Sequence, residues 1–243
     1  MPSSDDLAVI IPARDEADRI RATVAGAASL PGVGLVIVVD DGSRDGTAAA
    51  ARAAGASVVR HSRSRGKAAA METGAETAAL LDARDGRGQP RHLLFLDGDL
   101  GGTAGDAAPL AEPVRAGEAD MTIAVFTDRV RRGGHGFVVA LSGAGIERAT
   151  GWRPAQPLNG QRCLTRAAFE AGRPLAAGFG VETGLTIDLL RQGLRVKEVQ
   201  VPLAHRATGT DWRAQLHRAR QFADVARALA PRLVLGTRRQ RAG

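Results

Sequence analysis

The sequence predicts an α/β fold whose mainly parallel sheet is covered by helices on both faces. Three uninterrupted apolar runs, at 7–11, 35–39 and 93–96, are typical of strands buried on both faces of a parallel sheet. Segments with apolar residues at helical spacing alternate with these runs. Parallel strands need a crossover between them, so this alternation indicates right-handed strand–helix–strand units.

Each element of the first half has its own local signal. A helix is expected to begin near Ala17, because its first turn is acidic, as the helix dipole prefers. A second helix follows Asp45 and stops at Gly55, a residue suited to a helix C-terminus. The other expected elements are a short strand at 57–59, a helix from Lys67 to about Leu81 and a polar, glycine-rich surface loop at 82–91.

The second half is less regular. We expect helices near 107–116, 138–149 and 182–192 and strands at 121–125 and 196–201. A last helix, at about 212–229, has an apolar face that should pack on the protein's own core; this face comprises Trp212, Leu216, Ala219, Ala223, Ala226 and Leu229. We expect residues 1–243 to form a single domain, with one half at about 7–125 and the other at about 126–230.

Composition narrows the class of protein. Hydrophobic residues make up 44% of the 243, but no apolar run approaches the roughly 18 residues of a membrane span. No secretory signal is recognisable, and the single cysteine, Cys163, excludes an internal disulfide; both observations suit a cytoplasmic protein. A net charge of +7 favours anionic partners, whereas 3% aromatic residues with no tyrosine argue against a nucleic-acid stacking surface.

Two carboxylates mark the end of the most apolar strand. Asp97 and Asp99, separated by Gly98, follow the run at 93–96 directly. In open α/β sheets ligands bind at this carboxyl edge, and hard oxygen ligands suit a divalent metal whose shell phosphate oxygens complete. A plain polar turn is the structural alternative. Other predicted strand ends bring further charged residues to the same edge: Arg14, Asp15, Asp40, Asp41 and Lys67.

Three classes of function fit such an edge: a metal-dependent transferase with a nucleotide donor, a phospho-acceptor receiver module, and a nucleotide-binding protein without catalysis. A receiver carries its acid pair after the first strand, whereas a complete strand and helix precede Asp40 and Asp41 here, and the chain is twice too long. A dehydrogenase needs Gly-x-Gly-x-x-Gly after the first strand, where the sequence reads Pro12-Ala13-Arg14-Asp15.

Four motifs in order resemble those of the GT-A nucleotide-sugar glycosyltransferases of family 2. They are Ile11–Glu16, Val39–Thr47, Arg65–Lys67 and the Asp-x-Asp motif within Leu96–Leu100. The resemblance covers residues 7 to 130. The second half is similar to glucosyl-3-phosphoglycerate synthases and related bacterial enzymes through Gly178–Leu185 and His205-Arg206. Dolichyl-phosphate mannose synthases share the first half but match the second less well.

The resemblance implies a GT-A fold and transfer of a hexose from a nucleotide-diphosphate sugar to a small soluble, anionic acceptor, with Mg²⁺ or Mn²⁺. It implies that Pro12, Ala13, Arg14 and Glu16 line the nucleoside pocket, that Asp41 or Asp40 binds the base or ribose, and that Lys67 contacts the donor. It further implies that Asp99 and His205 ligate the metal with Asp97 nearby, that Glu182 faces sugar or acceptor, and that Arg131 and Arg132 belong to an acceptor loop.

Several points stay open. Arg14 stands where relatives often carry asparagine, and Asp40 could instead be structural. The alternatives are a polyprenyl-phosphate glycosyltransferase at the membrane surface, contacting lipid through the basic last helix, or a non-catalytic binder. Inversion needs a base, for which Glu182 is the candidate, whereas retention needs none. The expected catalytic residues are Glu182 and the metal ligand Asp99. A homodimer also stays open. The remaining histidines, His61, His92, His135 and His217, are expected to be solvated.

Overall fold

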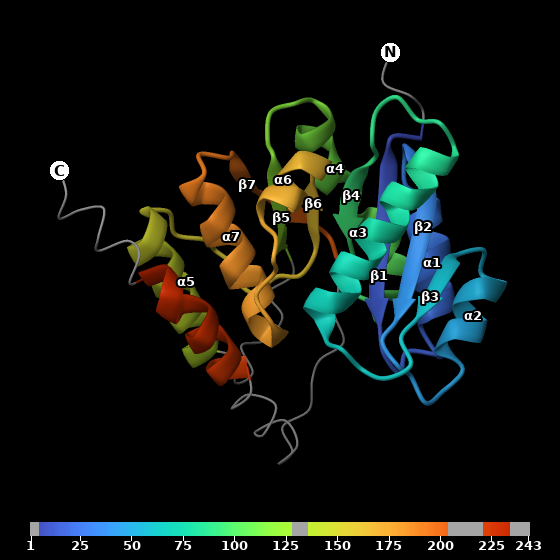
Figure 1. The fold of residues 1–243 in the computed structure, drawn as a ribbon, viewed down its shortest axis with the longest axis horizontal. Helices are drawn as coiled ribbons and strands as arrows, with labels where there is room; N and C mark the ends of the chain where they lie inside the picture. The colour runs from blue at the N-terminus through green and yellow to red at the C-terminus, as the bar shows by residue number, and fades with distance from the viewer. Residues whose placement is uncertain (1–4, 128–135, 204–220, 234–243) are drawn as a thin grey trace.

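A computed structural model describes residues 5–127, 136–203 and 221–233, and one seven-stranded sheet organises them (Figure 1). The strands are β1 (Leu7–Ala13), β2 (Val33–Asp40), β3 (Ser57–Arg60), β4 (His92–Phe95), β5 (Met121–Phe126), β6 (Arg162–Leu164) and β7 (Val196–Val201). Their order in the sheet is β3-β2-β1-β4-β6-β5-β7. Every pairing is parallel except the two made by β6. The predicted α/β fold with a mainly parallel sheet is confirmed.

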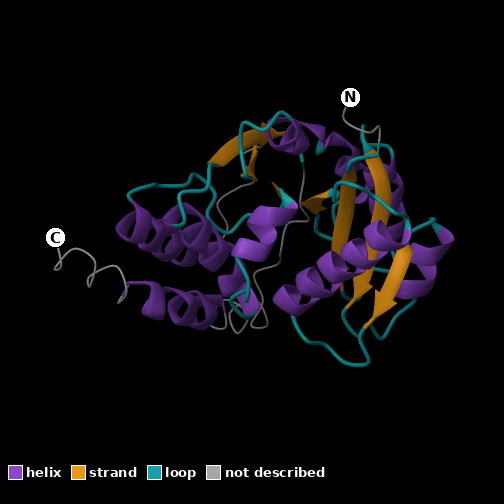
Figure 2. Ribbon diagram, turned by 45° about the horizontal axis from the view of Figure 1, so that its top comes forward, coloured by secondary structure: helices purple, strands orange, loops and turns teal. Residues whose placement is uncertain are grey.

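Helices cover both faces of this sheet (Figure 2). They are α1 (Ile20–Ala28), α2 (Thr47–Ala53), α3 (Lys67–Arg84), α4 (Ala108–Arg115), α5 (Gly136–Thr150), α6 (Arg166–Ala171) and α7 (Val181–Arg191). Two short 3-10 helices, η1 (Gly101–Asp106) and η2 (Gly178–Gly180), precede α4 and α7, and residues 221–233 are helical. None of the helices in the described ranges combines the length and apolar character needed to cross a bilayer.

The alternation of side chains along β1 divides the core into two layers. Val9 and Ile11 point to the face covered by α1, α2 and α4, and pack in one cluster with Val24. Ile10 points the other way and packs in a second cluster with Met71 of α3 and Phe169 of α6. Because β1 and β4 are buried on both faces, their sequences are almost entirely apolar, which is the signal that predicted them.

A third apolar cluster joins the last described helix to the rest of the protein. Val225 and Leu229 of residues 221–233 pack with Ile146 of α5 and Ile187 of α7, and Figure 1 shows this helix beside α5. The helix therefore packs on the protein's own core, as expected. Its buried face differs from the predicted one: Ala223 and Ala226 are half-buried, while Val225, Ala228 and Leu229 are buried. Trp212, Leu216 and Ala219 lie outside the described residues.

The start of the first helix also differs from the prediction. Helix α1 begins at Ile20 rather than Ala17. The backbone just before the helix is held by side chains of the 43–47 segment. The amide of Asp15 donates to Ser43 Oγ (3.0 Å), that of Glu16 to Thr47 Oγ1 (2.8 Å) and that of Ala17 to Asp45 Oδ2 (3.1 Å). These contacts fix the loop after β1 against the loop after β2.

Candidate active site at the carboxyl edge of the sheet

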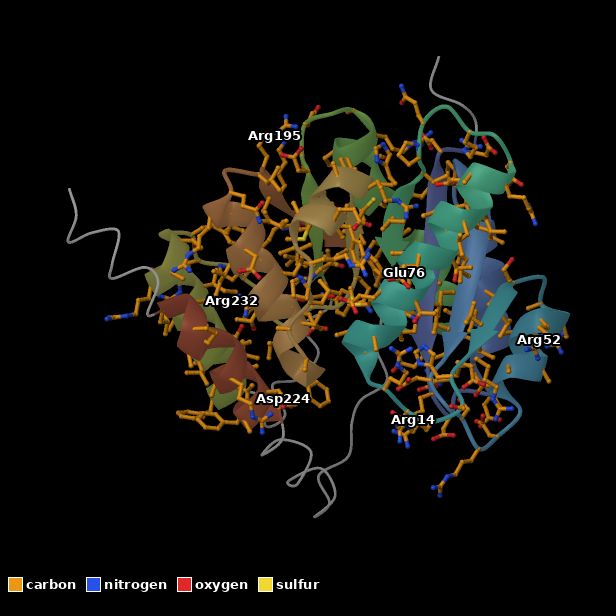
Figure 3. The ribbon with its side chains drawn as sticks, viewed as in Figure 1. Arg14, Arg52, Glu76, Arg195, Asp224 and Arg232 are labelled. Carbon is orange, nitrogen blue, oxygen red and sulfur yellow. The ribbon has the colours of Figure 1, made fainter. Side chains whose placement is uncertain are left out.

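The predicted site residues of the first half converge on one edge of the sheet. Strands β1, β2 and β4 are parallel, so the loops that follow them lie side by side. Ala13 at the end of β1 is paired with Asp40 at the end of β2. Figure 3 shows Arg14 at this edge, whereas Arg195, which precedes β7, lies at the opposite one. The same edge carries Pro12, Glu16, Asp41, Lys67, Asp97 and Asp99.

Lys67 forms the centre of a charged cluster built from both halves of the chain. Its Nζ lies 2.8 Å from Asp97 Oδ1 and 3.0 Å from Glu182 Oε1. Lys67 begins α3, Asp97 follows β4, and Glu182 lies in the first turn of α7. Burial would lower the pKa of the Lys67 ammonium, but the two carboxylates outweigh this and raise it. The ammonium is therefore firmly charged at neutral pH.

The turn before β6 closes this cluster from the other side. Gln161 Nε2 donates a hydrogen bond to Asp97 Oδ2 (2.7 Å). A Cβ at Gly160 would lie 2.2 Å from Lys67 Nζ and 3.2 Å from Asp97 Oδ1, so only a glycine leaves room for the ammonium. Neither residue was among the sequence-predicted site residues, because their partners are more than 60 positions away.

A buried arginine anchors that turn. Arg162 is 1% exposed, and its guanidinium donates to the carbonyl of Asn159 (2.9 Å) and to Thr186 Oγ1 on α7 (2.8 Å). Thr186 in turn donates to the carbonyl of Glu182 (2.8 Å). Burial lowers the pKa of Arg162 to about 10, although Glu182 and Glu198 act in the opposite direction. Arg162 thus connects β6 with the helix that carries Glu182.

Helix α1 holds the backbone of the Asp-Gly-Asp loop. Thr23 Oγ1 donates to the carbonyl of Gly98 (2.9 Å), and an Arg19 guanidinium nitrogen donates to the carbonyl of Asp99 (3.1 Å). A Cβ at Gly98 would lie 3.1 Å from the Cβ of Ala13, so the glycine permits a close approach to β1. The loop is fixed through its backbone, which leaves the two carboxylates half-buried at the edge.

This donor set fits a divalent cation shared with a ligand. No three His, Cys, Asp or Glu side chains within the described ranges lie close enough together to hold a metal alone. Asp97 and Asp99 supply hard carboxylate oxygens, and Mg²⁺ is commonly held by one or two carboxylates together with phosphate oxygens and water. The predicted ligand His205 and the predicted acceptor residues Arg131 and Arg132 lie outside the described residues.

Asp41 organises the loop that leads to Lys67. Its carboxylate accepts hydrogen bonds from the amides of Arg65 (2.7 Å) and Gly66 (2.9 Å) and from Ser64 Oγ (2.7 Å). It also lies 2.7 Å from His61 Nδ1. Burial would raise the pKa of Asp41, but the hydrogen bonds from Arg65, His61, Ser64 and Gly66 outweigh burial and lower it to about 2.

His61 corrects one expectation. It was predicted to be solvated, but it is 6% exposed and contacts Asp41 on one side and Thr73 Oγ1 of α3 (3.0 Å) on the other. His92 is half-buried, and His135 and His217 lie outside the described residues. The single cysteine, Cys163, is buried.

Asp40 is the most buried acid of the edge. Its Oδ1 accepts from the amide of Ser43 (2.8 Å), and its Oδ2 lies 3.2 Å from Arg60 Nε. Since Ser43 Oγ accepts from Asp15, Asp40 supports the loop that faces the end of β1. Arg14 is exposed, and its guanidinium donates to Ser64 Oγ (3.1 Å). Together these residues form the first-half wall of the site.

Comparisons with known proteins agree with this geometry. The family model described as Glycosyl transferase family 2 matches residues 8–165. Glycosyltransferase AglJ from Haloferax volcanii is 29% identical over 215 residues, which cover 87% of this chain and 67% of that protein. The crystal structure of glucosyl-3-phosphoglycerate synthase from Mycobacterium tuberculosis in complex with phosphoglyceric acid has a TM-score of 0.73 at 26% identity, over 93% of this chain and 79% of that one. The same synthase with Mn²⁺, uridine-diphosphate-glucose and phosphoglyceric acid has a TM-score of 0.72 at 25% identity, over 92% and 79%.

Proposed function

The chain belongs to glycosyl transferase family 2 and is a glycosyltransferase. We propose that it moves a hexose from a nucleotide-sugar donor, a uridine-diphosphate sugar, to a small anionic acceptor with the help of Mg²⁺ or Mn²⁺. The donor is chosen because the similar synthase from M. tuberculosis has been crystallised with uridine-diphosphate-glucose and Mn²⁺. The acceptor class is chosen because the same synthase binds phosphoglyceric acid.

One observation carries this proposal: the Lys67 ammonium lies between Asp97 and Glu182, with Asp99 two residues further along the same loop. Sugar transfer releases a nucleoside diphosphate, so negative charge builds up on the leaving group. A divalent cation, when bound, neutralises such charge. Carboxylates alone would repel a diphosphate, so the acids need both a cation and the charge of Lys67.

We assign the metal to Asp99, with Asp97 beside it and His205 as a further ligand. Lys67 contributes donors to the diphosphate oxygens, where a preorganised cation lowers the energy of the developing charge. Pro12, Ala13, Arg14 and Glu16 line the nucleoside pocket, together with Asp40 and Asp41. Asp41 also orders the loop 61–66, because its carboxylate accepts hydrogen bonds from two backbone amides of that loop.

Glu182 is assigned to the sugar and acceptor side, together with Arg131 and Arg132. Its Oε1 is engaged by Lys67 at 3.0 Å. This contact favours a role in orienting Lys67 and the sugar over that of a general base. We therefore propose transfer with retention of the anomeric configuration. The anomeric proton coupling of the product, measured by NMR, distinguishes retention from inversion.

The direct test is product formation. The protein is incubated with uridine-diphosphate-glucose, Mn²⁺ and 3-phosphoglycerate, and the glucosylated acid is detected by mass spectrometry. Transfer that is lost on chelation and in Lys67→Met supports the proposal. If a wider panel of phosphorylated and carboxylated acceptors gives no transfer while a polyprenyl phosphate in vesicles does, the acceptor class is wrong.

The membrane alternative has one observation in its favour. Phe137 is 73% exposed, and its ring stacks on that of Phe222, with 5.6 Å between the ring centroids. Exposed aromatic pairs suit a membrane interface. The assay with polyprenyl phosphate in vesicles, repeated with Phe137→Ser, tests whether this aromatic pair contributes to transfer at a membrane surface.

A further inference from the structure

Gln161 makes a contact that none of the assigned roles explains. It is fully buried (0% exposed), and its Nε2 donates to Asp97 Oδ2 at 2.7 Å. Its backbone is fixed as well: the amide donates to Asn159 Oδ1 (3.0 Å), and the carbonyl accepts from the amide of Ala124 in β5 (3.0 Å). The side chain is therefore aimed at Asp97 by a rigid backbone.

The orientation of the Gln161 amide is determined by charge. Turning the amide over would place Oε1 against the Asp97 carboxylate, two acceptors at hydrogen-bond distance. In the observed orientation Oε1 is buried and has no hydrogen-bond partner within the described part of the chain. A buried carbonyl without a partner destabilises a protein. An apolar side chain of similar length would avoid this cost, but it would also remove the hydrogen bond to Asp97, so the two effects oppose each other.

The Asp97 carboxylate receives donors from two directions. Lys67 Nζ approaches Oδ1 from the start of α3, and Gln161 Nε2 approaches Oδ2 from the turn before β6. Two donors on different oxygens fix both the position and the rotation of the carboxylate plane. Loss of the second donor would remove the hydrogen bond that holds Oδ2 on the side away from Lys67.

We propose that Gln161 is a positioning residue that holds the Asp97 carboxylate in the orientation needed for metal-dependent donor binding. This inference rests on the proposed function, because it takes Asp97 to lie at the metal and diphosphate. Because Gln161 is fully buried, it acts through Asp97. The unpartnered carbonyl oxygen of Gln161 is tolerated because the amide nitrogen of the same side chain orients a functional acid.

The test compares stability with nucleotide binding in Gln161→Met. Methionine has a similar length and no amide, so the substitution removes the unpartnered carbonyl together with the hydrogen bond to Asp97, and the thermal midpoint is expected to change little. Residues that orient metal ligands typically contribute about 10–100-fold to metal affinity or activity. We therefore expect calorimetry with Mn²⁺ present to show that Gln161→Met binds uridine diphosphate about 10-fold more weakly than wild type. Without Mn²⁺, the variant and wild type should have the same affinity for uridine diphosphate.

A matched control and a second variant keep the outcome clear. Gln192 donates from Nε2 to the carbonyl of Ala171 on an exposed surface, so Gln192→Met should change no binding constant. Gln161→Asn keeps the amide but is one methylene too short to reach Asp97. It is expected to show the same loss of Mn²⁺-dependent binding, and it replaces Gln161→Met if that variant does not fold.

The possible results separate this inference from the proposed function. If Mn²⁺ strengthens uridine diphosphate binding to Gln161→Met and Gln161→Asn as much as it does for wild type, Gln161 does not position Asp97. If stability and metal-free binding fall together with metal-dependent binding, the role of Gln161 is structural and the inference is wrong. If wild type shows no Mn²⁺-dependent binding at all, the proposed function fails, and this inference with it.

Discussion

Lys67 Nζ and Glu182 Oε1 lie 3.0 Å apart, although the two residues belong to helices from different halves of the chain. Both lie in the first turn of a helix, where the helix dipole favours an acid and disfavours a cation. Asp97 and Glu182 stabilise Lys67 at this position and offset the unfavourable helix dipole. Any change that removes one member of the cluster alters the charge balance of the other two.

Replacing Lys67 should abolish turnover. Lys67→Met removes the preorganised cation, and loss of one such group typically lowers turnover by about 10²–10³-fold. The only other lysine, Lys197, is paired with Glu118 at 3.0 Å on the surface, so Lys197→Met is the matched control. Turnover is measured with the donor and acceptor that wild type uses. Near-wild-type activity in Lys67→Met would show that Lys67 does not act on the donor.

A single methyl group at Gly160 should disturb the same cluster. Its Cβ would lie 2.2 Å from Lys67 Nζ, so the ammonium must move away from Asp97 or Glu182. We expect Gly160→Ala to fold and to lose at least about 10-fold in turnover, because displacement of a positioned group is costly. Gly88→Ala, at an open position, is the control. Equal activity of the two variants contradicts the close contact.

Asp99→Asn should separate folding from metal use. The backbone contact from Arg19 to the carbonyl of Asp99 does not depend on the carboxylate, so the thermal midpoint should change little. An amide is a weaker ligand for Mg²⁺ or Mn²⁺ than a carboxylate, so metal-dependent turnover should be lost. Thermal unfolding and a Mn²⁺ activation curve measure the two effects. Full activity with an unchanged activation curve rules out Asp99 as a metal ligand.

Asp41 should make stability depend on pH in the acid range. Its pKa is about 2 in the folded protein against 3.8 ordinarily, so its stabilising contribution is complete above about pH 4 and is lost as the pH falls toward 2. The shift corresponds to roughly 2 kcal/mol. In urea unfolding, Asp41→Asn should be less stable than wild type near pH 6, and the difference should narrow below about pH 4. A difference that is constant with pH excludes this account.

The sequence predicted the edge of the sheet well, for a physical reason. Strands that are buried on both faces must be apolar throughout, so charged residues at their ends, such as Asp40 and Asp97, are conspicuous. Parallel pairing then brings those ends to one edge. This is why the fold and the first-half wall of the site were predictable from one chain.

The parts that escaped prediction depend on contacts between distant segments. Strand β6 has only three residues and contains Arg162, so neither periodicity nor apolar content marks it as a strand. Gln161 contacts a residue 64 positions away, and nothing local distinguishes it from a surface glutamine. His61 is expected from the sequence to be solvated, whereas the structure buries it against Asp41 and α3, which are distant in sequence.

The central claim is that the acids of this edge accept a nucleoside diphosphate only together with a divalent cation. Calorimetric titration of the wild-type protein with uridine diphosphate, with and without Mn²⁺, tests it most directly. We expect binding with Mn²⁺ and a large loss of affinity when the metal is chelated. Binding of equal strength under both conditions, or no uptake of this or any other nucleoside diphosphate with Mn²⁺ present, would contradict it.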